Sequence, residues 1–249
     1  MIKIIEKEFL DDNFIIKPFT SNIKINENIY FKKDDTYYFG NYKKDKLNYI
    51  KEKIISGEYP PMSDLSEDKL QKELNISRTP VREAILRLEK EDFVYVYPRK
   101  GTIITDVTQD LIEDIYQVRR LIEPEMVVSS MHQIDKDWLR DMRRRFLEPD
   151  PALEGEQLRR YYISLDTELH SYIMAGCPNR YMRRMMRNIY DQNQRLRIAC
   201  SRADDADDGT TEEHVAILDA LLEGDKEELE RTLALHLEQS KERTIRSFR

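Results

Sequence analysis

The sequence predicts a mainly α-helical protein with two folded units, and three observations support this. The chain has 249 residues, which is enough for two modest domains that each bury a core. Only 7 residues are Gly, whereas 40% are hydrophobic and 36% are charged, a balance typical of a helical protein. Apolar residues in most of the chain recur at the three- and four-residue spacing of amphipathic helices. A short stretch near residues 93–104 alternates instead, which predicts a small β-hairpin.

An extension of unknown role, residues 1–43, precedes the first unit. It contains two β-prone runs, IKINENIYF and TYYFGNY, on either side of a KKDD sequence that suits a hairpin turn. The extension is therefore either a short β-rich element or a partly ordered tail.

Three short helices are predicted in the first unit, residues 44–106. Apolar residues recur at helical spacing as far as Ile55, and Gly57 follows where a helix is expected to end. Ser66 is a suitable N-cap for the second helix, and acidic residues follow it directly. Ser77 or Thr79 would cap the third helix. That helix has Pro80 in its first turn and a stripe of apolar residues expected to be buried: Val81, Ala84, Ile85 and Leu88.

After Glu91 the apolar spacing changes from helical to alternating. The run FVYVY is followed by a turn at residues 98–101, and TIITDV returns the chain. Three helices followed by a two-stranded hairpin is the order of a winged helix-turn-helix. In that architecture the third helix enters the DNA major groove, and the hairpin reaches the neighbouring backbone or the minor groove.

Basic residues occupy both places at which a winged helix contacts DNA. Arg78 and Arg82 are four residues apart at the start of the third helix, so they share one face. Arg99 and Lys100 lie at the hairpin tip. Because the chain has a net charge of −7, binding to nucleic acid must be local. The alternative for each arginine alone is a solvated side chain, as when Arg82 pairs with a nearby acid such as Glu83.

The second unit, residues 109–245, is predicted to be an all-helical bundle that contains all four histidines of the chain. Asp166 and His170 are four residues apart in LDTELHSYI, so they lie on one helix face. His214 lies in EEHVAILDALL and His236 in the final helix. A carboxylate with three imidazoles suits Zn²⁺, Ni²⁺, Mn²⁺ or Fe²⁺. On spacing alone, ordinary core or surface positions are the more common explanation for such histidines, and Asp-x-x-x-His by itself is a common pair.

Residues 47–105 resemble the DNA-binding domain of GntR-family transcription regulators, through LNYIKEKIISGEYPP and LSEDKLQKELNISRTPVREAILRLEKEDFVYVYPRKGTI. The resemblance implies base contacts from Arg78 and Arg82, phosphate or base contacts from Ser77 and Thr79, and a wing tip at Gly101. Lys69 occurs at a second-helix position that is often Arg in the family, and it would bind phosphate as a point charge. The implied partner is double-stranded operator DNA, with a homodimer covering two half-sites.

Residues 109–245 resemble, more loosely, the effector domain of the FadR subgroup, called the FCD domain. The resemblance rests on LIEDIYQVRRLIEPEMV, LDTELHSYIMAGCPN, EEHVAILDALLEGD and LALHLEQS. It implies a six-helix bundle, because the domain is short for the group, and a divalent metal bound by Asp166, His170, His214 and His236. It also implies a small carboxylate effector. Arg119 matches a cavity-facing arginine of the group, and Arg195 or Arg197 would supply a second guanidinium for the carboxylate.

The leading interpretation is a ligand-responsive transcription regulator without enzymatic activity. The alternative is a metal-dependent hydrolase with an accessory helix-turn-helix, in which Glu212 or Glu213 is the general base. The sequence contains no HExxH motif and no nucleophile with an identifiable base, which disfavours this alternative. No apolar run approaches the roughly 20 residues of a membrane span, and the first residues lack the features of a secretory signal. We therefore expect a cytoplasmic protein that does not enter a membrane.

Overall fold

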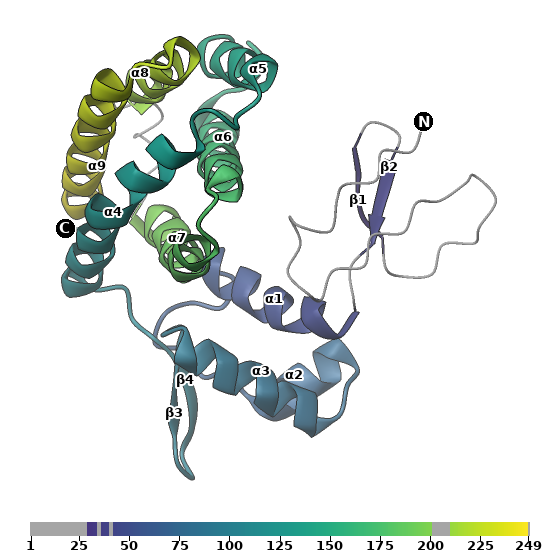
Figure 1. Ribbon diagram of the computed structural model, residues 1–249. Helices are drawn as coiled ribbons and strands as arrows, with labels where there is room; N and C mark the ends of the chain where they lie inside the picture. Colours follow the sequence, from purple (N-terminus) through teal and green to yellow (C-terminus); the bar gives the residue numbers. More distant parts are fainter. Residues whose placement is uncertain (1–28, 34–35, 40–41, 201–209, 249) are drawn as a thin grey trace. The chain divides into compact units, whose positions relative to one another are not determined.

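The structure is a computed structural model that describes residues 29–33, 36–39, 42–200 and 210–248. The chain divides into two units, Met1–Asp106 and Val107–Arg249, which are described separately. Helices dominate both units (Figure 1), which confirms the predicted fold class. Within the described ranges, no helix combines the length and apolar character needed to cross a membrane.

The described part of the extension contains two short strands. Strand β1 (Ile29–Lys33) pairs antiparallel with β2 (Thr36–Phe39), and Lys33 lies opposite Thr36. The two strands therefore pair on either side of residues 34–35, the last two of the predicted turn, which lie outside the described part of the chain. The extension's first 28 residues lie outside the described part of the chain.

The first unit continues with three helices and a second hairpin in the predicted order. The elements are α1 (Tyr42–Ile55), α2 (Glu67–Leu74), α3 (Arg78–Lys90), β3 (Val94–Tyr97) and β4 (Gly101–Ile104). Ser66 caps α2, because its side chain accepts a hydrogen bond from the Lys69 backbone N–H at 3.3 Å. Ser77 occupies the N-cap position of α3 but makes no capping hydrogen bond with its side chain.

The core of the first unit forms where α3 meets α1, α2 and the hairpin. The predicted stripe of α3 is buried, and it is joined by Ile50, Ile54, Leu70, Phe93, Val94 and Ile104. Each large apolar side chain buried in this way contributes about 1.5–3 kcal/mol to stability. This core fixes the angle between α2 and α3 and so presents the start of α3 to solvent.

A tight turn at residues 97–100 ends the β3–β4 hairpin, which is the wing. The Lys100 N–H donates to the Tyr97 carbonyl at 3.0 Å, and Arg99 has a left-handed backbone with φ of 66°. Gly101 follows with φ of 122°, a conformation that side-chain-bearing residues rarely adopt. The wing buries Val94 on one face and exposes Tyr95 and Tyr97 on the other, so its solvent side is aromatic and basic.

Six helices form the second unit within its described residues, as the resemblance implies. They are α4 (Gln109–Ser130), α5 (Lys136–Leu147), α6 (Gly155–Gly176), α7 (Arg180–Cys200), α8 (Thr210–Glu223) and α9 (Lys226–Phe248). Helix α4 packs against α6, α7 and α9, and α8 packs against α5 and α9 (Figure 1). The largest apolar cluster is formed by residues of α4, α5, α6, α8 and α9, including Leu139, Phe146, Leu165, Leu218 and Leu229.

Candidate functional site

Four predicted metal ligands meet in the interior of the second unit. Asp166 and His170 come from α6, His214 from α8 and His236 from α9. All four side chains are buried, and each offers a ligand atom within 4.8 Å of the others. Three helices distant in sequence thus bring one carboxylate and three imidazoles to one point.

Each imidazole is held by a hydrogen bond from its Nδ1 atom. His214 donates to the Thr210 carbonyl at 2.8 Å, His170 to Glu123 Oε1 at 2.9 Å, and His236 to Glu213 Oε2 at 2.9 Å. A carbonyl or an ionised carboxylate can only accept, so Nδ1 carries the proton in each ring. When such a ring is neutral, its Nε2 atom is the nitrogen left with a lone pair, which is the tautomer that metal ligation requires.

The protonation states fit this arrangement. Burial lowers the pKa of His214 well below its usual value and lowers the pKa of His236 to about 3, so both rings are neutral. Burial alone would raise the pKa of Glu123, but the charge of Arg119 and the hydrogen bonds from His170 and Arg119 outweigh it and hold that pKa far below the usual range. The pKa of Glu213 is likewise lowered, because hydrogen bonds from His236 and Arg243 outweigh its burial.

The Nε2 atoms of His214 and His170 both face one oxygen of Asp166. His214 Nε2 lies 2.9 Å from Asp166 Oδ1, and His170 Nε2 lies 3.5 Å from the same oxygen. Within the described part of the chain, neither Nε2 atom has a hydrogen-bond partner. Buried acceptors in contact with one another are unfavourable unless a cation lies between them. Metal–ligand bonds of about 2.0–2.2 Å place opposite ligands roughly 4 Å apart, so this donor set fits a single divalent ion.

Two arginines fix the carboxylates that orient the histidines. Arg119 Nε donates to Glu123 Oε2 at 2.9 Å, and Arg119 Nη1 donates to Asn193 at 3.0 Å. Arg243 donates to both oxygens of Glu213, at 2.5 and 2.6 Å. Outer partners of this kind set the orientation and basicity of metal ligands. The sequence did not reveal Glu123 or Glu213 in this role, because neither lies at a spacing that marks a ligand motif.

A cavity of about 80 Å³ lies beside the cluster and is lined by Asp166 and His170. Of the three arginines expected to bind an effector, Arg197 lines this cavity and pairs with Asp166 Oδ2. Arg119 and Arg195 are buried and are not among the lining residues. Arg187 lines the cavity and was missed. It shares one face of α7 with three other lining residues at three- and four-residue spacing, Tyr190, Gln194 and Arg197, and this polar periodicity was the available signal.

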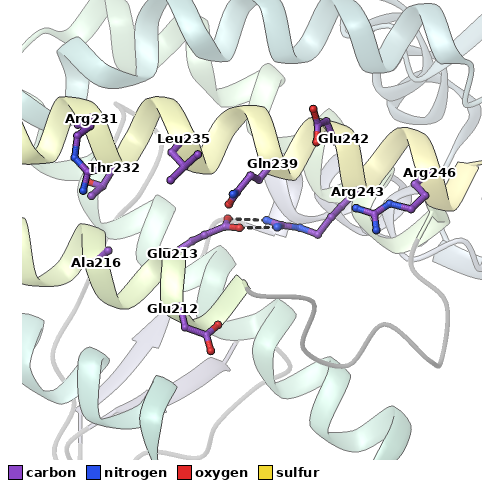
Figure 2. Close-up of a pocket in the computed structure, with 10 residues that line it drawn as sticks. All are labelled: Glu212, Glu213, Ala216, Arg231, Thr232, Leu235, Gln239, Glu242, Arg243 and Arg246. Carbon is purple, nitrogen blue, oxygen red and sulfur yellow. Dashed lines mark hydrogen bonds and ion pairs between the residues drawn. The ribbon is translucent and has the colours of Figure 1, made fainter.

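A larger, more open groove of about 600 Å³ lies between α8 and α9 (Figure 2). Figure 2 shows Glu213 and Arg243 facing each other across it. Both candidates for a hydrolytic general base line this groove, but Glu213 is held by His236 and Arg243, and Glu212 is exposed. Neither glutamate is thus placed as a base for a substrate at the histidine cluster.

The predicted DNA-contacting residues are all exposed in the first unit: Lys69, Ser77, Arg78, Thr79, Arg82, Arg99, Lys100 and Gly101. Two of them contact acids at the start of α2. Arg78 Nη2 lies 2.6 Å from Asp68 Oδ1, and Arg82 Nε donates to the Glu67 carboxylate at 3.0 and 3.1 Å. The acid that pairs with Arg82 is therefore Glu67 on the preceding helix and not Glu83.

Two family models match the chain: "Bacterial regulatory proteins, gntR family" over residues 47–104 and "FCD domain" over residues 114–239. An uncharacterised HTH-type transcriptional regulator of Bacillus subtilis, YdhC, is 24% identical over 189 residues, covering 76% of this chain and 84% of that protein. The Nta operon transcriptional regulator of Aminobacter aminovorans is 27% identical over 145 residues, covering 58% and 67%.

Solved structures agree at the level of the fold. A GntR transcriptional regulator from Rhodococcus sp. RHA1 superposes with a TM-score of 0.67 at 20% identity, covering 83% of this chain and 99% of that one. E. coli McbR/YncC gives a TM-score of 0.70 at 18% identity, covering 84% and 99%. The relatives are named as transcriptional regulators and give no support to the hydrolase alternative. The chain belongs to the GntR family of DNA-binding transcription regulators and carries an FCD effector-binding domain.

Proposed function

We propose that this regulator responds to a small carboxylate that binds in the second unit through a divalent metal. The observation that carries the proposal is the convergence of three buried imidazoles on one carboxylate, with the 2.9 Å approach of His214 Nε2 to Asp166 Oδ1 at its centre. A buried set of this kind binds Zn²⁺, Ni²⁺, Mn²⁺ or Fe²⁺ and leaves positions for a ligand oxygen. The bound ion would supply a Lewis-acidic docking point for the effector's carboxylate.

Arginine side chains in and near the cavity would favour a negatively charged effector. Arg197 lines the cavity and is the direct carboxylate contact in our proposal, because its guanidinium fork matches a carboxylate. Arg119 acts indirectly, since it holds Glu123 and through it His170. Arg195 lies on the same helix as Arg197 but does not line the cavity, so it is the least suited of the three.

In the first unit, α3 is proposed to read operator DNA in the major groove. Arg78 and Arg82 would contact base edges, where a good bidentate contact is worth about 1–3 kcal/mol of discrimination. Lys69, Ser77 and Thr79 would contact the backbone, and Arg99, Lys100 and Gly101 would place the wing against it. Because the partner is chromosomal DNA, we expect the protein to act in the cytoplasm.

We further propose a homodimer formed through the second unit. Three large apolar side chains on α4 and α7 are highly exposed: Leu121 at 74%, Tyr181 at 62% and Met185 at 59%. Helices α4 and α7 pack together, and Val118 and Ile122 continue the apolar surface beside Leu121 on α4. Exposed apolar patches of this kind mark interaction sites, and a two-fold dimer would cover both halves of a palindromic operator.

The test is the affinity of the full chain for a duplex selected from a randomised library, measured with and without small carboxylates in the presence of Zn²⁺, Ni²⁺ or Mn²⁺. At least one carboxylate should change the DNA affinity, and only when metal is present. His214→Ala should retain DNA binding and lose this response, because the DNA contacts lie in the other unit. A carboxylate response of equal size in metal-free protein would refute the role of the metal.

A further inference from the structure

The guanidinium of Arg82 is held at one corner only. Its Nε donates to Glu67 Oε1 at 3.1 Å and to Oε2 at 3.0 Å. Within the described part of the chain, its Nη1 and Nη2 atoms make no hydrogen bond. Arg82 is 59% exposed, whereas Glu67 is 30% exposed, so the acid is the more fixed partner. The two free nitrogens form the edge of the guanidinium that can bind a guanine bidentately.

Local structure fixes the position of Glu67. It is the first residue of α2, directly after the N-cap Ser66, where the helix dipole stabilises a carboxylate. The contact to Arg82 bridges 15 residues of sequence and joins the two helices of the helix-turn-helix. The orientation of Arg82 is therefore set from outside the helix that carries it.

We infer that Glu67 is a specificity-determining residue that positions Arg82 for base reading. An exposed arginine loses rotamer freedom when it binds a base, and a side chain already held at Nε loses less. The negative charge of Glu67 also repels the DNA phosphates, so it weakens binding to every duplex. It leaves the contact between Arg82 and its base in place. This inference rests on the proposed role of Arg82 as a base reader.

The neighbouring acid, Asp68, is arranged differently and serves as an internal contrast. Its Oδ1 lies 2.6 Å from Nη2 of Arg78, so it occupies the edge of Arg78 that a base would need. DNA must break this contact, which is highly exposed and therefore weak. Asp68→Ala should consequently strengthen binding to operator and random duplexes alike, whereas Glu67→Ala should reduce the ratio between them.

The experiment uses the full chain and a duplex selected by the wild type from a randomised library. Dissociation constants are measured by fluorescence anisotropy for this duplex, for its single-base-pair variants and for a random duplex. Glu67→Ala should lower the selected-over-random ratio by about tenfold, within the range that a bidentate base contact is worth. Glu83→Ala removes an equal, exposed charge from α3 without a contact to Arg82, so it is the matched control and should leave the ratio unchanged.

Two further variants show whether the positioning role of Glu67 or the base-reading role of Arg82 is wrong. Glu67→Gln keeps an oxygen that accepts from Nε but loses the charge, so it should bind all duplexes more tightly and retain most of the ratio. Glu67 Oε2 also lies 3.7 Å from Arg78 Nε, so in an Arg82→Ala background Glu67→Ala should cause only a much smaller further loss of discrimination than it causes in the wild type. If Arg82→Ala alone weakens selected and random duplexes equally, then Arg82 does not read bases, and both proposals fall.

If Arg82→Ala is selective but Glu67→Ala and Glu83→Ala change the ratio equally, only the positioning role of Glu67 is overturned. The same conclusion follows if Glu67→Ala leaves the ratio at the wild-type value while Arg82→Ala lowers it.

Discussion

Replacement of Glu123 by alanine removes the carboxylate that accepts hydrogen bonds from two buried side chains, Arg119 and His170. Glu123 is fully buried in α4 and accepts from Arg119 Nε at 2.9 Å, from Arg119 Nη2 at 3.4 Å and from His170 Nδ1 at 2.9 Å. Arg119 is itself only 1% exposed, so the variant leaves its charge buried without a counter-charge. Breaking a buried pair on one side costs about 3–5 kcal/mol. At roughly 2–4 °C per kcal/mol, the melting temperature of this unit should fall by about 6–20 °C.

The single tryptophan of the chain makes this measurement specific to the second unit. Trp138 lies in α5 and stacks on Tyr172 with ring centroids 3.7 Å apart. Its fluorescence during urea or thermal unfolding therefore follows the second unit even when the first unfolds separately. In the same variant, metal affinity should fall about 10–100-fold, because His170 loses the acceptor that fixes its tautomer.

The double variant Arg119→Met with Glu123→Leu is the control. It removes both charges and keeps apolar volume, so it should recover most of the lost stability, as such replacements often do. Metal affinity should remain low, since His170 still lacks its acceptor. A loss below about 1 kcal/mol for Glu123→Ala would show that the pair is not desolvated. Recovery of metal affinity in the double variant would refute the orienting role of Glu123.

Three further predictions concern pH, assembly and DNA. In the folded state His236 stays neutral down to a pKa of about 3, whereas in the unfolded chain it takes up a proton near pH 6.5. The stability of metal-free protein should therefore be full above pH 6.5 and decline as the pH falls below it. Urea unfolding followed by Trp138 fluorescence at pH 7 and pH 5 checks this, and equal stability at both pH values would contradict it. Leu121→Arg should shift the mass measured by light scattering from that of a dimer to that of a monomer, whereas Leu235→Arg, a change of an exposed residue on α9, should not. A Leu121→Arg protein that remains dimeric would show that the dimer interface lies elsewhere. Lys100→Ala should weaken all duplexes equally and reduce the slope of log affinity against log salt by about 1, and a base-dependent loss would show that the wing reads sequence.

Local signals in the sequence were sufficient for much of the fold. The Ser66 cap, the apolar stripe of α3 and the change from helical to alternating spacing after Glu91 are each set by neighbouring residues, and the structure agrees with all three. Among the four histidine-cluster residues, only the Asp166–His170 pair has a spacing that places both on one face. His214 and His236 join them through the packing of α8 and α9 on the rest of the unit, which only the family resemblance implied.

The partners of these residues could not be predicted, because they depend on tertiary packing. Glu123 lies 47 positions before His170, and Glu213 lies 23 before His236, so neither pair has a periodic relation. The alternative considered for Arg82 pairs it with a nearby acid such as Glu83 on its own helix, whereas the turn between α2 and α3 brings Glu67 to it. Arg195 and Arg197 could not be ranked from sequence, since both are near the end of α7 and only the bundle decides which one reaches the cavity.

The central claim is that Asp166, His170, His214 and His236 bind one divalent ion. Its most direct test is the metal content of untagged full-length chain, purified without chelators and measured by elemental analysis together with thermal shifts on adding Zn²⁺, Ni²⁺ or Mn²⁺. The account predicts about one ion per chain in the wild type and a marked loss in His214→Ala. At free metal about 100-fold above the dissociation constant, binding should add about 2.7 kcal/mol to stability. Less than about 0.1 ion per chain, with no thermal shift for any of the three metals, would contradict the claim and make these four residues ordinary buried polar groups.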